Sequence, residues 1–390
     1  MTQLFSPFPL RALTLPNRIV VAPMCQYSAV DGSATDWHVI HLGQLALSGA
    51  GLLVIEATHV EPQGRITSDC LGLYSDDNEA ALARVLAVVR RYSRMPIGLQ
   101  LSHAGRKASA KRPSAPGPND TGQWQVEGPS PIAFSADRQV PLALDRAGMD
   151  RVIAAFEQAA RRSARLGLDL LEIHSAHGYL LSTFLSPLAN QRGDSYGGSL
   201  ANRMRFPLEV FEAVRAAWPS ERPLGVRCNG TDWHAHGITP EEAVAYARAL
   251  RDLGCDFVDV STGGNAVTEI PLGPGYQVPF AAHVRREAGI PTRVAGLIRD
   301  PRHAEAIVAD GEADLVALGR GLLNDPRWPW HAAEELGHRM EVPFQYWRAA
   351  TRDGLPTRDH IPVRGQGTGV PGTGGLLQAP PGSALPHAPR

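Results

Sequence analysis

The sequence predicts an α/β protein that folds as a (β/α)₈ barrel, and three observations support this. Eight short apolar runs follow one another along the chain, and segments long enough for helices separate them. The length of 390 residues suits one such barrel, which commonly takes roughly 250 to 400 residues. Near-continuous apolar runs are typical of strands that are covered on both faces. A doubly wound open sheet is the alternative, although no run is followed by the Gly-x-Gly-x-x-Gly fingerprint of dinucleotide-binding domains.

The eight runs are the predicted strands, in chain order. They span residues 18–24, 51–58, 96–103, 168–174, 223–229, 256–262, 291–297 and 313–320. Helices are predicted between them over residues 76–92, 145–166 and 239–253, with a shorter one from residue 300. Thr239, followed by Pro240 and two glutamates, is a typical helix start. It combines an N-cap, a first-turn proline and acidic side chains at the positive end of the helix dipole.

Two segments differ from this alternation. Residues 104–144 follow the third strand, are rich in Pro, Gly, Ser and Asn, and are far longer than an ordinary strand-to-helix loop. We expect this insertion to cap the C-terminal face of the barrel and to shape substrate access. Residues 351–390 contain 8 Gly and 7 Pro. Such a segment buries too little apolar surface to offset its ordering entropy, so we expect a flexible tail after a folded part of residues 1–350.

Composition and charge exclude several classes of protein. Hydrophobic residues make up 43% of the chain and charged residues 20%, which supplies a sizeable core and excludes a disordered or fibrous protein. The 38 Lys and Arg residues balance 39 Asp and Glu residues, so the formal net charge of -1 indicates neither nucleic acid nor an anionic membrane as partner. No apolar run reaches the length of a spanning helix, and Met1–Phe8 lacks a secretory-signal pattern. We therefore expect a cytoplasmic globular protein.

The four cysteines are Cys25, Cys70, Cys228 and Cys255, and no two of them form a Cys-x-x-Cys pair. This spacing argues against a disulfide scaffold, a zinc ribbon or an iron–sulfur cluster. Cys25 lies at the end of the first predicted strand, where a barrel places ligand-binding groups. No basic residue stands beside it in the sequence to activate it as a nucleophile, and a buried, inert thiol is the alternative.

The last two predicted strands end in features that suit a phosphate group. Gly296 and Gly319 expose backbone N–H groups without an obstructing Cβ, and the helices that follow direct their positive ends toward the same point. Arg320 adds a planar cation suited to phosphate. Barrels commonly build a phosphate site from these strands. The alternative is an ordinary tight turn with Arg320 in a salt bridge.

The fourth predicted strand ends in His174 and His177, with Tyr179 two residues further on. Two imidazoles can donate hydrogen bonds to one substrate oxygen and so polarise a carbonyl or nitro group. Tyr179 can then deliver a proton to the adjacent carbon. The alternatives are a pair of structural histidines or a metal site. The metal site lacks an evident third ligand and the His-Glu-x-x-His motif.

Arg227 lies inside the apolar fifth strand. A buried guanidinium requires an anionic or strongly accepting partner, because an unpaired buried charge is very costly. A bound cofactor that becomes negative on reduction meets this requirement.

Six short motifs, taken together and in order, resemble those of one known family. They are Pro16-Asn17-Arg18, residues 22–28 (APMCQYS), 100–107 (QLSHAGRK), 172–180 (EIHSAHGYL), 196–203 (YGGSLANR) and Gly319-Arg320. The chain resembles the Old Yellow Enzyme family of FMN-dependent ene-reductases, in its smaller bacterial, thermophilic-like branch. The resemblance extends from residue 4 to about residue 348, and the motifs are highly specific in combination.

The resemblance implies a role for each candidate residue. The implied FMN-binding residues are Pro23, Met24, Cys25, Ala57, Gln100, Arg227, Gly296, Gly319 and Arg320. Among these, Arg227 would stabilise the reduced flavin and Cys25 would modulate its potential. His174 and His177 would hold the activating oxygen of the substrate, with Tyr179 as the proton donor. Tyr27 and Lys107 would belong to the substrate pocket, and no metal is implied.

The implied activity is that of an NADPH dehydrogenase, a flavoprotein oxidoreductase that reduces activated alkenes. NADPH or NADH would reduce FMN. The C=C bond of an α,β-unsaturated carbonyl or nitro compound would then receive a hydride from flavin N5 and a proton from Tyr179. A metal-dependent barrel hydrolase that uses His174 and His177 is one alternative, and a non-catalytic flavin- or phosphate-binding barrel is another.

The segment Gln345-Tyr346-Trp347-Arg348 also resembles this branch of the family. The resemblance implies that Arg348 reaches into the active site of a neighbouring protomer, and therefore a homodimer or homotetramer. The alternative is an exposed arginine on a loop.

Overall fold

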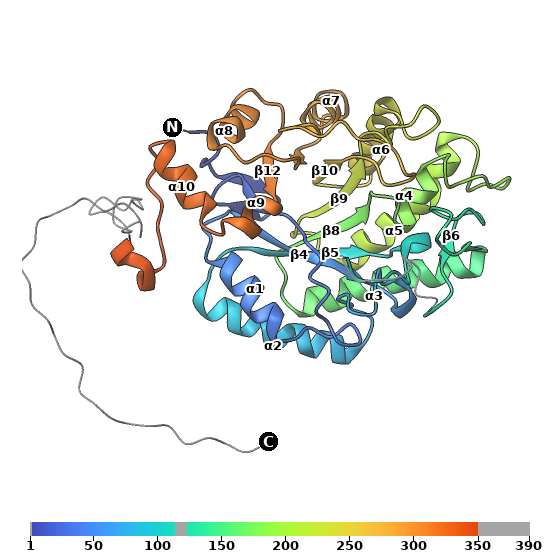
Figure 1. Ribbon diagram of the computed structural model, residues 1–390, viewed down its shortest axis with the longest axis horizontal. Helices are drawn as coiled ribbons and strands as arrows, with labels where there is room; N and C mark the ends of the chain where they lie inside the picture. Colours follow the sequence, from blue (N-terminus) through green and yellow to red (C-terminus); the bar gives the residue numbers. More distant parts are fainter. Residues whose placement is uncertain (1, 114–122, 350–390) are drawn as a thin grey trace, which may run out of the picture. The chain divides into compact units, whose positions relative to one another are not determined.

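Eight parallel strands close into a barrel, and the helices lie around its outside (Figure 1). The computed structural model describes residues 2–113 and 123–349. Around the barrel the strands are β3 (Ile19–Val21), β4 (Leu52–His59), β5 (Ile97–Ser102), β8 (Leu170–Ser175), β9 (Leu224–Asn229), β10 (Phe257–Ser261), β11 (Thr292–Val294) and β12 (Leu315–Leu318). Each of them lies inside its predicted segment or extends one residue beyond it. The predicted fold class is therefore confirmed.

The α-helices of the described residues are α1 (Asp36–Ala46), α2 (Asp76–Tyr92), α3 (Arg146–Arg165), α4 (Leu180–Leu185), α5 (Leu200–Ala217), α6 (Pro240–Asp252), α7 (Val278–Ala288), α8 (Pro301–Ala309), α9 (Arg320–Asn324) and α10 (Trp328–Glu335). The four predicted helices correspond to α2, α3, α6 and α8, which begin within one residue of their predicted starts, and the described part of the chain adds six more. Thr239 caps α6 by accepting a hydrogen bond from the Glu242 N–H, and the Glu242 side chain accepts one from the Thr239 N–H. Asp300 caps α8 by accepting one hydrogen bond from the His303 N–H. These caps satisfy N–H groups that lack partners within the helix.

The inside of the barrel is filled by its own apolar cluster, separate from the larger core between strands and helices. The antiparallel hairpin of β1 (Phe8–Leu10) and β2 (Leu13–Leu15) contributes Phe8, Leu10 and Leu15 to this inner cluster. The barrel strands contribute Val20, Ala22, Leu52, Val54, Leu170, Phe257, Leu315 and Ala317. Because the hairpin precedes β3, Phe8, Leu10 and Leu15 fill the N-terminal end of the barrel.

Alternate residues of each strand face the barrel interior, because side chains along a strand have a period of two. On β8, Leu170 belongs to the inner cluster, whereas Leu171 and Ile173 belong to the outer core. Glu172 and His174 therefore share the inward face with Leu170. The inward residues change from apolar at the N-terminal end, through a charged layer, to the imidazole of His174 at the C-terminal end.

The insertion that follows β5 is described over residues 104–113 and 123–144. It contains the short helix η2 (Gly105–Lys107) and the paired strands β6 (Glu127–Gly128) and β7 (Leu142–Ala143). Arg106 donates hydrogen bonds to the carbonyl groups of Ile132 within the insertion and of Asn265 after β10. The insertion thus contacts a loop at the C-terminal end of the strands. Its role as a cap stays a prediction.

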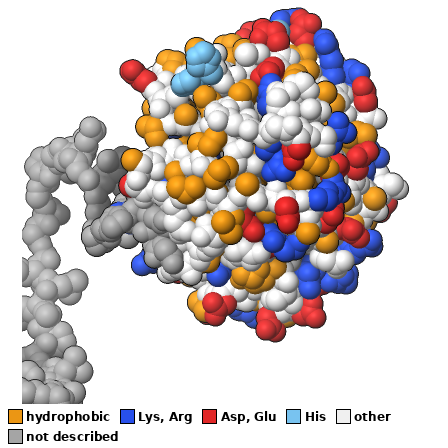
Figure 2. Space-filling view, turned by 90° about the vertical axis from the view of Figure 1, so that its right-hand side faces the viewer, with side chains coloured by type: hydrophobic (Ala, Val, Ile, Leu, Met, Phe, Trp, Pro, Cys, Tyr) orange, Lys and Arg blue, Asp and Glu red, His pale blue; other side chains and the backbone are white. Residues whose placement is uncertain are grey.

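Residues 351–390, predicted to form a flexible tail, lie outside the described residues. None of the helices in the described part of the chain is long and apolar enough to cross a membrane. Figure 2 shows basic and acidic side chains interspersed over the face that it presents, without a broad area of either sign. This distribution agrees with the near-zero net charge of the chain.

Candidate active site

A cavity of about 290 Å³ lies at the C-terminal ends of the barrel strands. Its lining includes the predicted residues Pro23, Met24, His177, Arg227, Gly296, Gly319 and Arg320. The structure therefore brings together residues from β3, β8, β9, β11 and β12 and the loops after them. It also places Ser261, Tyr276, Gln277 and Arg299 there, which the sequence analysis did not single out.

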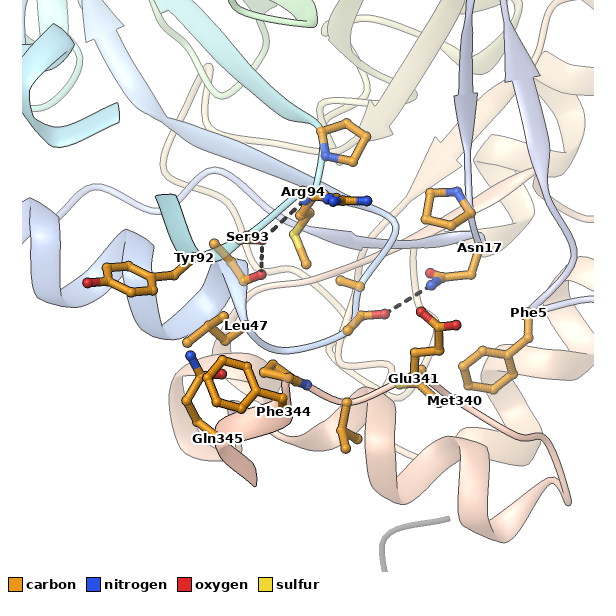
Figure 3. A pocket seen from close by; sticks show the side chains of 18 of the residues that line it. Phe5, Asn17, Leu47, Tyr92, Ser93, Arg94, Met340, Glu341, Phe344 and Gln345 are labelled. Carbon is orange, nitrogen blue, oxygen red and sulfur yellow. Dashed lines mark hydrogen bonds between the residues drawn. The ribbon is translucent and has the colours of Figure 1, made fainter. Parts of the chain in front are cut away.

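A larger groove of about 1040 Å³ lies elsewhere, between the short helix η3 (Phe344–Ala349) with the segment before it and the barrel (Figure 3). In Figure 3, Phe344 and Gln345 line one side, and Tyr92 and Ser93 line another. The barrel residues in its lining, such as Asn17, precede the strands. Barrel enzymes place their chemistry at the opposite end of the strands, so the smaller cavity is the candidate active site.

One end of the smaller cavity suits an anionic group. Gly296 has a φ of 134°, a backbone conformation that favours glycine. A Cβ at Gly319 would lie 3.5 Å from the Met24 sulfur, an ordinary van der Waals contact. Arg299 and Arg320 are both exposed, and neither forms an ion pair with another described residue. Two unpaired guanidinium groups beside glycine-rich turns are suited to a phosphate.

The floor of the cavity is charged. The Nε of Arg227 lies 3.1 Å from Oδ2 of Asp259 on the neighbouring strand. Asp259 therefore supplies, inside the protein, the anionic partner that the sequence analysis expected Arg227 to have. Deeper in the barrel, Gln100 donates a hydrogen bond of 2.6 Å to Glu172. Both Gln100 and Glu172 are buried.

The two predicted histidines bind each other. The Nδ1 of His174 accepts a hydrogen bond from the Ala176 N–H at 3.2 Å, so its Nε2 carries the proton in the neutral ring. That Nε2 lies 3.2 Å from Nδ1 of His177, whose Nε2 lies 2.6 Å from the Ser261 hydroxyl. Burial lowers the pKa of both rings well below the usual range, which keeps them neutral. Both rings can donate to one substrate oxygen only if it replaces their mutual hydrogen bond and the His177 proton moves from Nε2 to Nδ1.

Tyr179 lies beside these rings in an apolar environment. Its ring centroid is 4.8 Å from that of His174. Together with Cys25, Tyr27 and Trp124 it packs against a buried apolar cluster made of Ile66, Cys70, Ala104, Ala108, Ala110 and Val126. Burial raises the pKa of the Tyr179 hydroxyl well above its usual value, so the phenol stays protonated. A protonated phenol is the form that a proton donor requires.

Two further predicted residues lie around Tyr179. Burial raises the pKa of the Cys25 thiol well above its usual value, and the thiol hydrogen-bonds to the backbone of Ala57. The Lys107 ammonium donates hydrogen bonds to the carbonyls of His177, at 2.8 Å, and Gly264, at 3.2 Å. Burial lowers the pKa of Lys107 to about 7, and its Nζ lies 5.4 Å from the Tyr179 ring centroid. Lys107 thus bridges the loop after β8 and the loop after β10 by hydrogen bonds.

Comparisons with known proteins identify the family. Residues 3–338 match the NADH:flavin oxidoreductase / NADH oxidase family. The NADPH dehydrogenase of Geobacillus thermodenitrificans is 45% identical over 349 residues, which cover 89% of this chain and 98% of the relative. That of Listeria innocua is 42% identical over 351 residues, which cover 90% and 99%. The chain belongs to the Old Yellow Enzyme family.

Solved structures of this family share the fold. Morphinone reductase superposes with a TM-score of 0.72 at 29% identity, over 88% of this chain and 91% of that one. The Old Yellow Enzyme homologue of Zymomonas mobilis gives 0.72 at 26% identity, over 91% and 98%. This Old Yellow Enzyme family member is therefore a flavin-dependent oxidoreductase that uses FMN with a nicotinamide donor. The cavity fits FMN, because two unpaired guanidinium groups suit its phosphate and Arg227 offers a cation at the floor.

His174 and His177 have no third metal ligand beside them among the described residues. The described part of the chain contains one cluster with the spacing of a metal site, formed by Glu61, His103 and Glu127. Arg151 pairs with Glu61 at 2.9 Å and with Glu127 at 2.6 Å. The guanidinium already offsets the charge of this cluster, and nothing supports the alternative of a metal-dependent hydrolase.

Arg348 does not line the cavity of its own chain. It is exposed on η3, in a segment whose Phe344 and Trp347 side chains are 83% and 70% exposed. The sequence analysis named Arg348 but assigned no role to Arg299, Ser261, Gln277 or Asp259. A basic residue three positions after Gly296 is the one local signal that points to Arg299. The other three residues are recognisable only once the strands are placed side by side.

Proposed function

We propose that this enzyme reduces the C=C bond of α,β-unsaturated carbonyl or nitro compounds. The observation that carries the proposal is the cluster of His177, His174 and Tyr179 beside the cavity with the charged floor. His177 lines this cavity, its Nδ1 lies 3.2 Å from Nε2 of His174, and the ring centroid of Tyr179 lies 4.8 Å from that of His174. Burial keeps the two imidazoles neutral and the phenol protonated. FMN supplies the hydride transfer, from NADPH or NADH to the alkene. The chain supplies binding, polarisation of the substrate and the proton.

The cofactor residues fall into two groups. Gly296, Gly319 and Arg320 hold the phosphate, together with Arg299, because their donors and cations converge at one end of the cavity. The remaining residues line or approach the flavin ring: Pro23, Met24, Cys25, Ala57, Gln100 and Arg227. Of these, Arg227 places a cation below the cavity, where it favours the reduced, more negative form of the cofactor.

His174 and His177 bind the activating oxygen of the substrate. Neutral rings donate N–H groups without carrying a charge, and hydrogen bonds in a water-excluding site polarise a carbonyl or nitro group effectively. His174 already carries its proton on Nε2, as the hydrogen bond to its Nδ1 dictates. The substrate oxygen replaces the bond between the two rings. Tyr27 and Lys107 complete the pocket around Tyr179.

Tyr179 donates the proton to the carbon next to the activating group. Its phenol is 4.8 Å, ring to ring, from His174, so it adjoins the place where the oxygen is bound. Replacing Tyr179 with Phe removes only the acidic hydroxyl. We expect Tyr179→Phe to slow alkene reduction by about 10²- to 10⁴-fold, the usual contribution of a general acid, and to leave flavin reduction by NADPH nearly unchanged.

Two measurements test this proposal. The purified protein is expected to show the visible absorption of oxidised flavin, to release FMN on denaturation, and to oxidise NADPH faster with 2-cyclohexenone. Rapid-mixing kinetics then separate the two half-reactions of Tyr179→Phe. Tyr74→Phe is the matched control, because the Tyr74 hydroxyl donates to the Asp31 carbonyl away from the cavity. Equal losses in both half-reactions of Tyr179→Phe refute the role as proton donor, and a protein that binds no FMN refutes the whole proposal.

The exposed aromatic side chains beside Arg348 support an assembly. We propose a homodimer or homotetramer in which Arg348 reaches the active site of a neighbouring protomer. Light scattering tests the oligomeric state. Arg348→Ala is expected to raise the KM for the alkene about ten- to a hundredfold without loss of FMN, since a charged hydrogen bond is worth about 1.5 to 3 kcal/mol. Co-expressed Arg348→Ala and Tyr179→Phe chains are expected to regain activity, because mixed assemblies contain sites with both groups intact. A monomer, or mixed chains without recovery, refutes this arrangement.

A further inference from the structure

Arg293, in the middle of β11, is the largest fully buried side chain of the described residues, with 0% of it exposed. The proposed mechanism gives it no role. A guanidinium this deep is very costly unless it is paired, because burial removes its hydration. Its partners therefore show what it does for the protein.

Arg293 shares a carboxylate with the arginine at the cavity floor. Its Nη2 donates to Oδ2 of Asp259 at 2.8 Å, and the Nε of Arg227 lies 3.1 Å from the same oxygen. The strand register explains the arrangement. Asp259 on β10 stands opposite Arg293 on β11 and opposite Arg227 on β9. A change at Arg293 therefore alters how tightly Asp259 holds Arg227.

A second contact leads to Gln100. The Nη2 of Arg293 also donates to Oε2 of Glu172, whose Oε1 accepts the hydrogen bond from Gln100. Glu172 and Asp259 are both buried, at 0% and 1% exposure. The two carboxylates and the two arginines, Arg227 and Arg293, have a formal net charge of zero. Arg293 is thus connected to Arg227 through Asp259 and to Gln100 through Glu172. Arg227 and Gln100 are the polar residues that we place at the flavin ring.

We propose that Arg293 is a positioning residue that raises the reduction potential of the bound flavin. This inference rests on the proposed placement of Arg227 and Gln100 at the cofactor. Without the Arg293 charge, two carboxylates face a single arginine, and the layer below the cavity becomes net negative. Reduced FMN carries more negative charge than oxidised FMN. The loss therefore weakens binding of the reduced form more than that of the oxidised form, and the potential falls.

Protonation of Glu172 gives this effect a pH dependence. Burial raises the pKa of Glu172, and the Arg293 guanidinium opposes that rise. The groups that face Glu172 are Gln100 and Arg227 from the two neighbouring strands, and Asp259 and Arg293 from β10 and β11. When Arg293 is absent, Glu172 takes up a proton more readily at low pH and restores neutrality. The lowered potential is therefore expected to appear at high pH and to shrink as the pH falls.

Three variants test the proposal with the FMN-loaded protein. R293M removes the positive charge but keeps an unbranched chain, E172Q removes a negative charge, and R293M/E172Q returns the layer to zero. The midpoint potential and the Kd for oxidised FMN are measured from about pH 6 to about pH 9, the range over which buried carboxyl groups titrate. We expect R293M to bind reduced FMN at least tenfold more weakly relative to oxidised FMN, a fall of about 30 mV for a two-electron couple. E172Q is expected to shift the potential upward by a similar amount, and the double variant to lie near the wild type.

Arg203→Met is the matched control. Arg203 is also a buried arginine, 5% exposed, that pairs with a carboxylate, Glu242, but it lies on α5 outside the barrel. Its loss is expected to lower the melting temperature without moving the potential. An R293M potential equal to that of the wild type at every pH overturns the proposal, and so does a double variant that stays as low as R293M. If R293M does not fold, an unshifted E172Q potential overturns it equally. Failure of the wild type to bind FMN refutes the proposed function instead.

Discussion

The contact between the loops after β8 and β10 allows a quantitative test of how the active site is built. Gly178, between His177 and Tyr179, has a φ of +72°. A Cβ at this position would lie 1.9 Å from the carbonyl oxygen of Gly264 and 2.7 Å from its carbon. These atoms belong to backbone, which cannot rotate away as a flexible side chain does. Gly178→Ala therefore has to push the two loops apart.

The cost of Gly178→Ala has two parts that a control variant separates. The left-handed backbone costs an L-residue about 1 to 2 kcal/mol, and overpacking against fixed atoms adds about 1 to 3 kcal/mol. We therefore expect a loss of roughly 2 to 5 kcal/mol in the free energy of unfolding. Gly198 has nearly the same φ, +77°, but a Cβ there would meet nothing within 4 Å. Gly198→Ala is expected to show the first part alone.

Urea unfolding of both variants, with and without a fixed excess of FMN, measures these losses. Because the displaced segment carries His177 and Tyr179, Gly178→Ala is also expected to slow alkene reduction, whereas Gly198→Ala keeps the wild-type rate. FMN must be held constant, since a bound cofactor stabilises the folded state by mass action. Equal losses of stability in the two variants refute the reasoning, because the contact with Gly264 would then cost nothing.

Two further predictions concern the substrate pocket and acid stability. Trp124 packs against the same apolar cluster as Tyr179. Trp124→Ala is expected to raise kcat/KM for bulky substituted enones about tenfold relative to 2-cyclohexenone, because a change of this size is usual when a pocket gains space. Flavin reduction is expected to stay unchanged. An equal change for both substrates contradicts a role in specificity. Burial lowers the pKa of His59 from 6.5 to about 3, so between these pH values the folded state binds fewer protons than the unfolded state. The free energy of unfolding therefore falls by about 1.4 kcal/mol per pH unit as the pH drops from 6.5 toward 3. His59→Asn keeps a donor for the Leu71 carbonyl and removes the titration, so its stability measured by urea unfolding is expected to fall less steeply below pH 6.5. Parallel curves for the two proteins contradict this.

The strands and helix starts could be predicted from the sequence because their signals are local. A barrel strand is covered on both faces, so the run over residues 168–174 is nearly continuous in apolar residues even though it contains Glu172. The cap of α6 by Thr239 depends only on residues within one helical turn. Such features are read correctly from a few neighbouring residues, and the structure confirms them.

The protonation pattern of His174 and His177 could not be predicted from neighbouring residues in the sequence. The sequence places His174 and His177 three residues apart and leaves the direction of their N–H groups open. Three other residues decide it: Ala176 fixes the proton of His174, and Ser261 and Gln277, from β10 and α7's N-cap, continue the chain of hydrogen bonds beyond His177. These partners are about 84 and 100 residues away along the chain, so the closure of the barrel, and not the spacing of the motif, brings them together.

The charged layer below the cavity could not be predicted from the loop motifs, because it consists of alternate, inward-facing residues within the strands. Leu170, Glu172 and His174 occupy successive inward levels of β8. Phe257, Asp259 and Ser261 repeat this order on β10. Motifs at the loops describe only the uppermost level, where the substrate binds. In the proposed arrangement the middle level sets the electrostatic field at the flavin, because Glu172, Asp259 and Arg293 are fully buried and are not screened by solvent. Two barrels with identical loop motifs can therefore differ in flavin potential through a single inward-facing residue such as Arg293.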